Sequence, residues 1–382
     1  MKIKKNVRLL SALALFGGFI TSGVAFAQDA GAQSLPTANQ HALFIETDSP
    51  SGNSILSYLR GSDGTISLAG TFPTGGLGAA GANSSAAPLG SQDGLVLVNS
   101  GQELIATNAG SDTVSLFDVS GTQLKLVQKI ASGGQFPNSI SSHGDLVAVL
   151  NAGGAGAVQE FSFDHGKLVA LASENRTLGL ANTTPPDYVH GAGQVGYSPN
   201  GEHLVVTTKD STNSYDVFSV SPNGVLGATP VVSASNNPVP YDFNFDAAGN
   251  LFAIEAGTSS ASVYSINANG TLTSLGSVSD NAKALCWVSS ANGYFYGSNA
   301  GSSNITTFDE TSTGAPQIVA SVAATTHAGT TDSVVSPDGK FLYVESGGAG
   351  TIDVFAIGAD AALTPVTTVF NIPPASEGIA VS

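Results

Sequence analysis

The chain has very little cysteine and few charged residues, and both shortages limit what it can be. Its 382 residues include a single cysteine, Cys286, so no disulfide can form within the chain and packing must hold the fold together. We expect Cys286 to be a small buried apolar residue; a reactive thiol or an intermolecular bridge is the alternative. Charged residues make up 10% of the chain, and helix formers such as Lys, Glu, Arg and Gln are scarce. Abundant Gly, Ser, Thr, Ala and Val indicate short β-strands joined by tight turns.

Basic residues are especially rare. Twelve Lys and Arg residues stand against 28 Asp and Glu residues, which gives a formal net charge of −16. A surface of this sign repels nucleic acid and anionic membranes, because proteins that bind them neutralise phosphate with Lys and Arg. We therefore expect no nucleic-acid partner and no membrane anchor. The expected partner of this protein, which we expect to be a monomer, is a small polar or anionic ligand or a glycan.

One apolar run, at residues 9–20, has the length of a secretory signal. Four basic side chains precede it, and Ala25-Phe26-Ala27 has the small-x-small pattern of a cleavage site. The run is shorter than the roughly 20 residues that cross a bilayer, although a retained anchor is the alternative. We predict a signal peptide at 1–27, a tail at 28–40 and a single domain at 41–382. The mature protein is then periplasmic or extracellular.

A repeat runs through the remainder of the chain. Its unit is a strand ending in Asn or Glu, a Gly/Ser/Asp turn and a strand ending in an aromatic residue, seen most clearly at 104–117, 294–308 and 341–355. The first apolar or aromatic residue of the second of these strands falls at Ile55, Val114, Val158, Tyr215, Ala261, Ile305 and Ile352, with spacings of 59, 44, 57, 46, 44 and 47. A period in the forties predicts an all-β fold, a seven-bladed β-propeller with four strands per blade. A parallel β-solenoid is the alternative.

The two long spacings and the two chain ends add detail to this prediction. The spacings place insertions around residues 75–90 and 175–193. Residues 376–382 have the pattern of an innermost strand, whereas the first repeat, from His41, lacks one. We therefore predict that the C-terminal strand completes the first blade beside residues 43–46. Such closure leaves no open sheet edges that would invite aggregation.

The repeat also resembles a known family. Ser336-Pro-Asp-Gly-Lys-Phe-Leu-Tyr-Val344, followed by Gly350-Thr-Ile-Asp-Val-Phe-Ala-Ile357, is similar to the repeat of bacterial lactonase-like propellers. These include 6-phosphogluconolactonases and 3-carboxymuconate cyclases, and the resemblance covers residues 41–382. Segments beginning at Gln194 and Phe252, together with Cys286-Trp-Val288, resemble an exported branch of that family. For this branch the resemblance implies the architecture and not a substrate.

The resemblance also implies where lactone chemistry would lie. In the enzymes of the family, a His and an Arg on inner strands and a Glu at the end of a second strand serve the lactone. Here the His position falls at Gly193, three residues after His190, and the Arg stretch reads Pro238-Val-Pro-Tyr241. Glu255 lies one place from the aligned Glu. We therefore leave open whether the protein is an enzyme.

A candidate site arises from the repeat itself. The last position of the second strand reads Glu46, Asn108, Asn151, Lys209, Glu255, Asn299 and Glu345 around the seven blades. We expect these side chains to encircle the axis on the face where the inter-blade loops lie. The alternatives are turn-stabilising amides for Asn and solvated charge for Glu. Lys209 and Glu255 are the one pair of opposite-charge neighbours, and we expect them to approach each other as a brace or as a ligand site.

Two chemistries fit this ring. In the first, Lys209 and Glu255 are the catalytic candidates: Lys209 holds a carboxylate or polarises a carbonyl, and Glu255 acts as the base. In the second, Glu46 and Glu345 help to hold Ca²⁺, which takes six to eight oxygen ligands. We expect no other cofactor. The candidate ligand-binding residues are Asn108, Asn151, Gln194, Trp287, Asn299, His190 and His327.

Two of these candidates have particular places in the repeat. His190 and His327 fall in loops between blades, on the expected ligand face. Trp287 falls on an inner strand, where it either packs in the core or covers the axial pocket. The chain has no Gly-rich phosphate loop, no metal-spaced Cys/His cluster and no Gly-x-Ser-x-Gly turn.

Two functions therefore compete. One is a hydrolase or isomerase of lactones or cyclic sugar acids that works in the axial pocket. The other is a non-catalytic propeller that binds a glycan, peptide or protein outside the cytoplasm.

Overall fold

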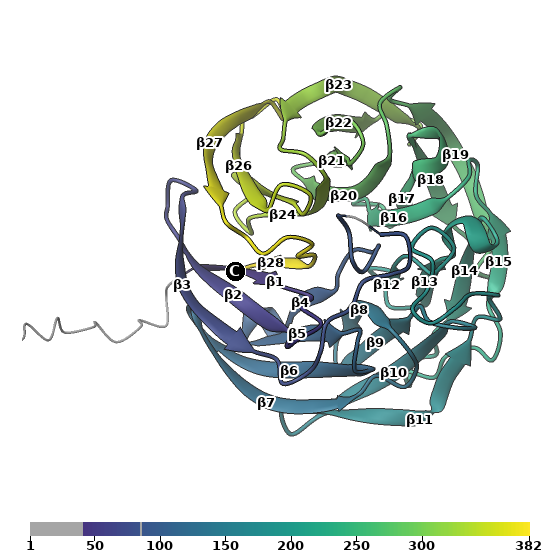
Figure 1. Ribbon diagram of the computed structural model, residues 1–382. Helices are drawn as coiled ribbons and strands as arrows, with labels where there is room; N and C mark the ends of the chain where they lie inside the picture. Colours follow the sequence, from purple (N-terminus) through teal and green to yellow (C-terminus); the bar gives the residue numbers. More distant parts are fainter. Residues whose placement is uncertain (1–40, 85) are drawn as a thin grey trace, which may run out of the picture. The chain divides into compact units, whose positions relative to one another are not determined.

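The protein forms seven four-stranded antiparallel sheets arranged as the blades of a propeller (Figure 1). A computed structural model describes residues 41–84 and 86–382; the predicted signal peptide and tail lie outside these residues. The first blade consists of β28 (Ile379–Val381), β1 (Ala42–Glu46), β2 (Ser54–Arg60) and β3 (Ile66–Pro73). The predicted seven-bladed all-β fold is confirmed.

The other six blades follow in chain order, each from its innermost to its outermost strand. Blades two to four are β4 (Leu95–Val98), β5 (Glu103–Asn108), β6 (Thr113–Ser120) and β7 (Gln123–Ala131); β8 (Pro137–His143), β9 (Leu146–Asn151), β10 (Ala157–Asp164) and β11 (Lys167–Thr177); and β12 (Val195–Tyr197), β13 (His203–Thr207), β14 (Ser214–Ser219) and β15 (Val231–Ala234). Blades five to seven are β16 (Pro240–Phe245), β17 (Leu251–Glu255), β18 (Ser260–Ile266) and β19 (Leu272–Ser279); β20 (Leu285–Ala291), β21 (Tyr294–Asn299), β22 (Asn304–Glu310) and β23 (Pro316–Thr325); and β24 (Thr330–Val335), β25 (Phe341–Ser346), β26 (Thr351–Ile357) and β27 (Leu363–Phe370).

Short 3₁₀ turns interrupt the strand order. They are η1 (Asn99–Gly101), η2 (Lys209–Ser211) and η3 (Ala256–Thr258). No helix in the described part of the chain is long or apolar enough to cross a membrane.

The C-terminal strand closes the ring as predicted. β28 pairs antiparallel with β1, with Leu43 opposite Val381, Phe44 opposite Ala380 and Ile45 opposite Ile379. The Arg60 guanidinium also donates to the Ser382 carbonyl at 3.0 Å. The first blade is therefore built from both ends of the described chain, and β28 covers the edge that β1 would otherwise leave open.

Apolar side chains between neighbouring blades form the core. Each of the seven contacts between adjacent blades holds a cluster of buried apolar side chains. Between the last and first blades, for example, Leu43 and Ile45 pack with Tyr343 and Ile352. Strand side chains alternate between the two faces of a sheet, so both faces of each blade become buried.

The strand directions define two faces of the propeller. We call the "loop face" the side that carries the connections between blades and the turns between second and third strands. The "turn face", on the opposite side, carries the turns between first and second strands. Both predicted insertions are connections on the loop face: residues 74–94 between β3 and β4, and residues 178–194 between β11 and β12.

Candidate functional site

The end positions of the second strands do not form one ring. Glu46 and Glu345 pair with Ile55 and Ile352 on their third strands. Both partners are the first apolar residue of the third strand. In four other blades the strand-end residue pairs one position before that residue: Asn108 with Thr113, Asn151 with Ala157, Glu255 with Ser260 and Asn299 with Asn304. A one-residue offset turns a strand side chain to the opposite face of its sheet. The prediction that all seven side chains encircle the axis is therefore wrong.

The three asparagines at these positions are fully buried and bond both within their blades and to the preceding blade or connection. Asn108 donates to Ser115 Oγ at 2.9 Å, and Asn299 donates to Thr306 Oγ1 at 3.0 Å. Asn151 donates to the Ser132 carbonyl at 3.1 Å. These amides fix the loop-face ends of the blades, as the turn-stabilising alternative expected, and leave no surface for a ligand.

Glu255 is fully buried and is a structural carboxylate. Its Oε1 accepts hydrogen bonds from Tyr264 Oη at 2.6 Å and Tyr215 Oη at 3.3 Å, and from the Asn236 amide at 3.0 Å. Its Oε2 accepts from Asn237 Nδ2 at 2.6 Å and from Ser262 Oγ at 2.7 Å. Five donors occupy the carboxylate, so neither a water nor a substrate can reach its oxygens without breaking a buried bond.

Lys209 points toward the axis and away from Glu255. Its backbone has a φ of +46° and begins η2, two residues after β13 ends. The ammonium donates to the carbonyls of Gly90, at 2.8 Å, and of Tyr188. It also lies 4.9 Å from the centre of the Tyr241 ring. Burial lowers the pKa of Lys209 to about 8, against the opposing effect of the Glu377 carboxylate.

The predicted Lys209–Glu255 pair does not form. No ion pair joins the two residues, and the charged or dipolar groups that each contacts are different. The left-handed backbone at Lys209 removes it from the strand register that the repeat implies, so its side chain leaves the position that Glu255 keeps in the next blade.

A segment of the first insertion, the connection between β3 and β4, lies on the axis of the propeller. We call residues 86–93 the "axial segment". Ala87 packs with Tyr241, Cys286 and Trp287, and Leu89 packs with Ala109, Phe136 and Ala152. Figure 1 shows this dark-blue part of the chain in the centre of the ring. The axial segment therefore fills the loop-face end of the axis.

Polar contacts to several blades hold the axial segment in place. The Glu377 carboxylate accepts hydrogen bonds from the backbone amides of Leu89 at 2.6 Å, Gly90 at 3.0 Å and Ser91 at 3.0 Å. Trp287 Nε1 donates to the Ser91 carbonyl at 2.8 Å. Trp287 is 2% exposed, which favours the core interpretation of this residue over the covering one.

The family's His position is closed to any side chain here. A Cβ at Gly193 would lie 2.5 Å from the Tyr241 carbonyl oxygen and 2.6 Å from Thr207 Oγ1. Gln194, the neighbouring candidate, is buried and bridges two blades: its Nε2 donates to Asp93 Oδ2 at 2.9 Å, and its Oε1 accepts from the Phe243 amide at 2.7 Å. Gln194 thus anchors the end of the axial segment.

Polar residues gather near the starts of the inner strands, and of these Gln194 and Trp287 are among the predicted site residues. Asp93, Gln194 and Glu377 lie one or two residues before β4, β12 and β28. Asn138, Asp242 and Asp332 lie within the first three residues of β8, β16 and β24, and Trp287 is the third residue of β20. Register shifts interrupt β8, β16, β20 and β24 at this end, and such bulges redirect side chains. A polar residue near the start of six of the seven inner strands is visible in the sequence.

Asp242, Asp332 and Glu377 of this inner set are buried and Asp93 is partly buried, with little compensating positive charge. Burial raises the pKa of Asp93 to about 6 and that of Glu377 to about 7, although three backbone amides oppose the shift at Glu377. Burial also raises the pKa of Asp242 and Asp332 well above the ordinary value, and the Asp93 charge raises both further. These groups disfavour an anionic ligand at the axis.

Glu46 and Glu345 do not come together with other ligands as a metal site. Glu46 Oε1 accepts a 2.5 Å hydrogen bond from Asn53, while Glu345 is fully buried with neither carboxylate oxygen hydrogen-bonded. Burial raises the pKa of both glutamates well above the usual range. Across residues 41–84 and 86–382, no group of three His, Cys, Asp or Glu side chains is arranged to hold a metal ion. The convergence on which the Ca²⁺ expectation depends is not found there.

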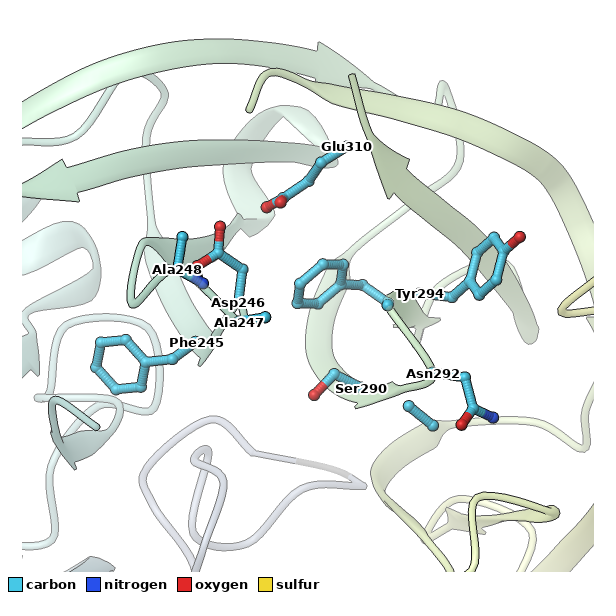
Figure 2. Close-up of a pocket in the computed structure, with 11 residues that line it drawn as sticks. Phe245, Asp246, Ala247, Ala248, Ser290, Asn292, Tyr294 and Glu310 are labelled. Atoms are coloured by element: carbon cyan, nitrogen blue, oxygen red, sulfur yellow. Dashed lines mark hydrogen bonds between the residues drawn. The ribbon is translucent and has the colours of Figure 1, made fainter. Parts of the chain in front are cut away.

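Three hollows lie between blades on the turn face. One of about 400 Å³ lies between blades five and six (Figure 2). Pockets of about 390 Å³ and 610 Å³ lie beside Glu202 and His203, near the turns of blade four. None of these three is lined by a residue of the predicted axial site.

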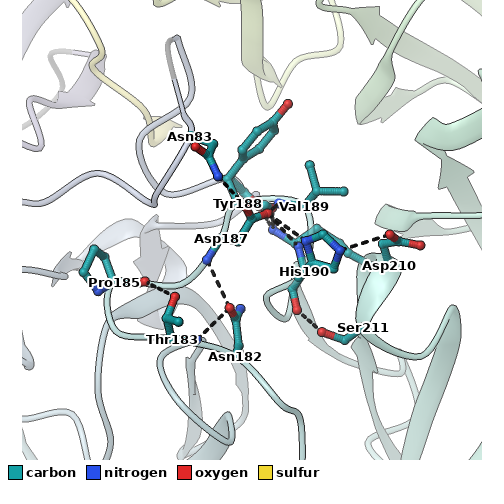
Figure 3. Close-up of polar contacts among 12 residues, drawn as sticks. Asn83, Asn182, Thr183, Pro185, Asp187, Tyr188, Val189, His190, Asp210 and Ser211 are labelled. Atoms are coloured by element: carbon teal, nitrogen blue, oxygen red, sulfur yellow. Dashed lines mark hydrogen bonds and ion pairs between the residues drawn. The ribbon is translucent and has the colours of Figure 1, made fainter.

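His190 lies on the loop face between two carboxylates. Its Nδ1 is 2.9 Å from Asp187 Oδ1 and its Nε2 is 3.2 Å from Asp210 Oδ2. Figure 3 shows the imidazole between them, with Asn83 bound to the far side of Asp187. The side chains of His190, Asp187 and Asp210 are 52%, 26% and 42% exposed. The hydrogen bond from His190 lowers the pKa of Asp187 to about 2.

His327 forms a second imidazole–carboxylate contact in the loop between β23 and β24. Its Nδ1 lies 2.8 Å from Oδ1 of the buried Asp353, which also accepts a 2.8 Å hydrogen bond from Thr368. The ring packs edge-on against Phe370, with 5.4 Å between centres. The His327 side chain is 43% exposed. Both histidines thus lie in inter-blade loops, as predicted.

The fold defines the class of protein as a closed seven-bladed β-propeller, and the comparisons with known proteins agree. The model of the family described as "Lactonase, 7-bladed beta-propeller" matches residues 250–376. The predicted resemblance to lactonase-like propellers is therefore confirmed. No curated protein sequence matches the chain.

Solved structures share the whole propeller. The periplasmic gluconolactonase of Pseudomonas aeruginosa is 18% identical, with a TM-score of 0.68 over 90% of this chain and 99% of that one. A protein proposed to be a 6-phosphogluconolactonase, from Bacteroides fragilis, is 16% identical, with a TM-score of 0.67 over 91% and 100%. A protein from Lactobacillus plantarum is 15% identical, with a TM-score of 0.70 over 90% and 99%. At these identities the likeness establishes the fold.

Proposed function

We propose that the protein is an exported, non-catalytic propeller of lactonase-like fold that binds a neutral hydroxylated ligand, a sugar or sugar lactone, on its loop face. The Asp187–His190–Asp210 cluster carries this proposal, because its three side chains are accessible and aligned in one polar group. The signal-like N-terminal sequence supports export. The likeness to a periplasmic gluconolactonase supports it further.

The burial of both catalytic candidates is evidence against hydrolysis at the axis. Lys209 is 1% exposed and Glu255 is fully buried, and both have their polar atoms engaged by the protein. A general base must come within hydrogen-bond reach of the proton it abstracts, directly or through one water. The axial segment also occupies the space that a lactone would need above the inner strands.

We call Asp187, His190 and Asp210 the "loop-face cluster". Its negative charge determines which class of ligand it can bind. Asp187 and Asp210 repel a carboxylate, so a sugar acid is a poor ligand there. Carboxylate oxygens accept hydrogen bonds from hydroxyl groups, the His190 imidazole holds the two carboxylates in place, and Asn83 adds a side-chain amide beside them. A neutral polyhydroxylated ring matches this set of partners.

Calorimetric titration tests this proposal with glucono-1,5-lactone, methyl glucoside, chitotriose and gluconate. We expect a neutral member of the series to bind, and His190→Ala to weaken that binding at least tenfold because both carboxylates lose their shared partner. His165→Ala is the matched control, since His165 is 96% exposed on a hairpin turn. Unchanged binding in His190→Ala, or preferential binding of gluconate, would reject the site.

A second candidate function is lactone hydrolysis with His327 as the base. Asp353 holds Nδ1 of the ring, which leaves Nε2 free to take a proton from water. The hydroxide would attack the lactone carbonyl, the ring C–O bond would break, and the imidazolium would protonate the departing alkoxide. This function requires saturable lactone hydrolysis that His327→Ala abolishes and His165→Ala leaves intact.

A further inference from the structure

The pocket between blades five and six has two carboxyl groups facing each other. Asp246 lies in the turn after β16, and Glu310 is the last residue of β22. Figure 2 shows both side chains directed toward each other across one side of the pocket. The pocket measures about 400 Å³, which falls in the range of small-molecule sites.

Asp246 is held rigidly by its own turn. Its Oδ1 accepts hydrogen bonds from the amides of Ala248 at 2.8 Å and Asn250 at 2.7 Å. Its Oδ2 accepts from Asn250 Nδ2 at 2.7 Å. This turn places a carboxylate at the pocket wall, and it would be disturbed by replacing Asp246.

Glu310 is half-buried beside Asp246 and has one carboxylate oxygen without a partner. Its Oε1 is buried and makes no hydrogen bond. Burial, together with the charge of Asp246, a hydrogen bond to Asp246 and the charge of Asp309, raises the pKa of Glu310 to about 7. Two facing carboxyl groups repel each other when both are ionised, and a cation in the pocket would relieve that repulsion.

The residues that line the pocket determine which ligand could bind the two carboxyl groups. Phe245, Tyr294 and Phe295 contribute aromatic surface, whereas Ala247, Ala248 and Gly293 leave room. No Lys or Arg is among the eleven lining residues. An anion would be repelled, and a neutral alcohol would leave the carboxyl pair without a counter-charge. An ammonium group supplies both charge and N–H donors, and aromatic rings beside it add cation–π attraction.

We propose that this pocket binds a small organic amine in its ammonium form, with Glu310 and Asp246 as the paired acceptors. The site is separate from the loop-face cluster, because it lies at the opposite ends of the strands. Its occupant is a small molecule, since the two carboxylates do not include the third ligand of a metal site.

Calorimetric titration of the full chain with benzylammonium chloride tests this site, with benzyl alcohol as the neutral probe of similar shape. We expect benzylammonium to bind at least tenfold more tightly than benzyl alcohol. Glu310→Gln should remove this preference while keeping the turn at Asp246. Glu202→Gln is the matched control, because it removes one charge from the same face but does not line this pocket.

Proton release gives a second, independent measurement. Binding of the cation should expel the Glu310 proton, so titrations in buffers of different ionisation enthalpy should show release at pH 6 that disappears by about pH 8.5. Glu310→Gln should show no release at either pH. Equal binding of the two probes, unchanged affinity in Glu310→Gln, or no binding at millimolar benzylammonium would overturn the proposal.

Discussion

Deletion of residues 376–382 should leave a chain that does not fold cooperatively. The deletion removes β28, whose Ile379, Ala380 and Val381 are each less than 10% exposed, and opens the edge of β1. Burying one large aliphatic side chain contributes about 1.5–3 kcal/mol, and the stability of a whole domain is about 5–15 kcal/mol. The loss of the strand and its hydrogen bonds therefore approaches the total stability. Thermal unfolding followed by circular dichroism measures it.

The same deletion removes the anchor of the axial segment. Glu377→Gln keeps β28 but replaces one carboxylate oxygen that accepts amide hydrogen bonds, so we expect it to cost about 1–3 kcal/mol. Comparing the two variants separates the closure of the ring from the anchoring of the segment. A truncated protein that melts at the wild-type temperature would show that the ring closes without β28.

Thermal stability should fall as the pH rises from 5 to 8. The folded-state pKa values of Asp93, about 6, and Glu377, about 7, lie above the ordinary carboxyl values, as do those of Asp242, Asp332 and Glu345. The folded state therefore binds more protons than the unfolded state between about pH 4 and 7, and stability decreases with pH across that window. One unit of pKa shift corresponds to about 1.4 kcal/mol. We expect the melting temperature to be at least about 5 °C higher at pH 5 than at pH 8.

Glu345→Gln identifies the buried acids as the cause of this pH dependence. Glu345 is fully buried with neither carboxylate oxygen hydrogen-bonded, so the neutral amide should raise the melting temperature at pH 8 and reduce the difference between the two pH values. Asp63→Asn is the control, because Asp63 lies at an exposed turn. A melting temperature that rises from pH 5 to 8, or identical curves for wild type and Glu345→Gln, would contradict the account.

The repeat predicted the architecture because every blade packs its strands against the neighbouring blades in the same way. Seven copies of one strand pattern gave the number of blades, and the missing inner strand before His41 predicted the closure by β28. The two long spacings located both insertions correctly. Each of these features depends on local strand and turn chemistry, which the sequence carries at every copy.

The candidate site was harder to predict because it depends on departures from the repeat. The positive φ at Lys209 redirects its side chain, and the one-residue offset at Glu46 and Glu345 turns theirs to the other face. The course of the axial segment follows from a long-range contact, the Glu377 carboxylate on three amides almost 290 residues away. No local pattern encodes such a contact.

Hydrolysis of glucono-1,5-lactone, followed by acid release at pH 7, tests most directly the claim that the axis is closed and that Lys209 and Glu255 are structural. We expect the wild-type protein to leave the rate at that of buffer alone, and Lys209→Ala and Glu255→Gln to change only the melting temperature. Saturable hydrolysis by the wild-type protein that disappears in folded Lys209→Ala or Glu255→Gln would contradict it.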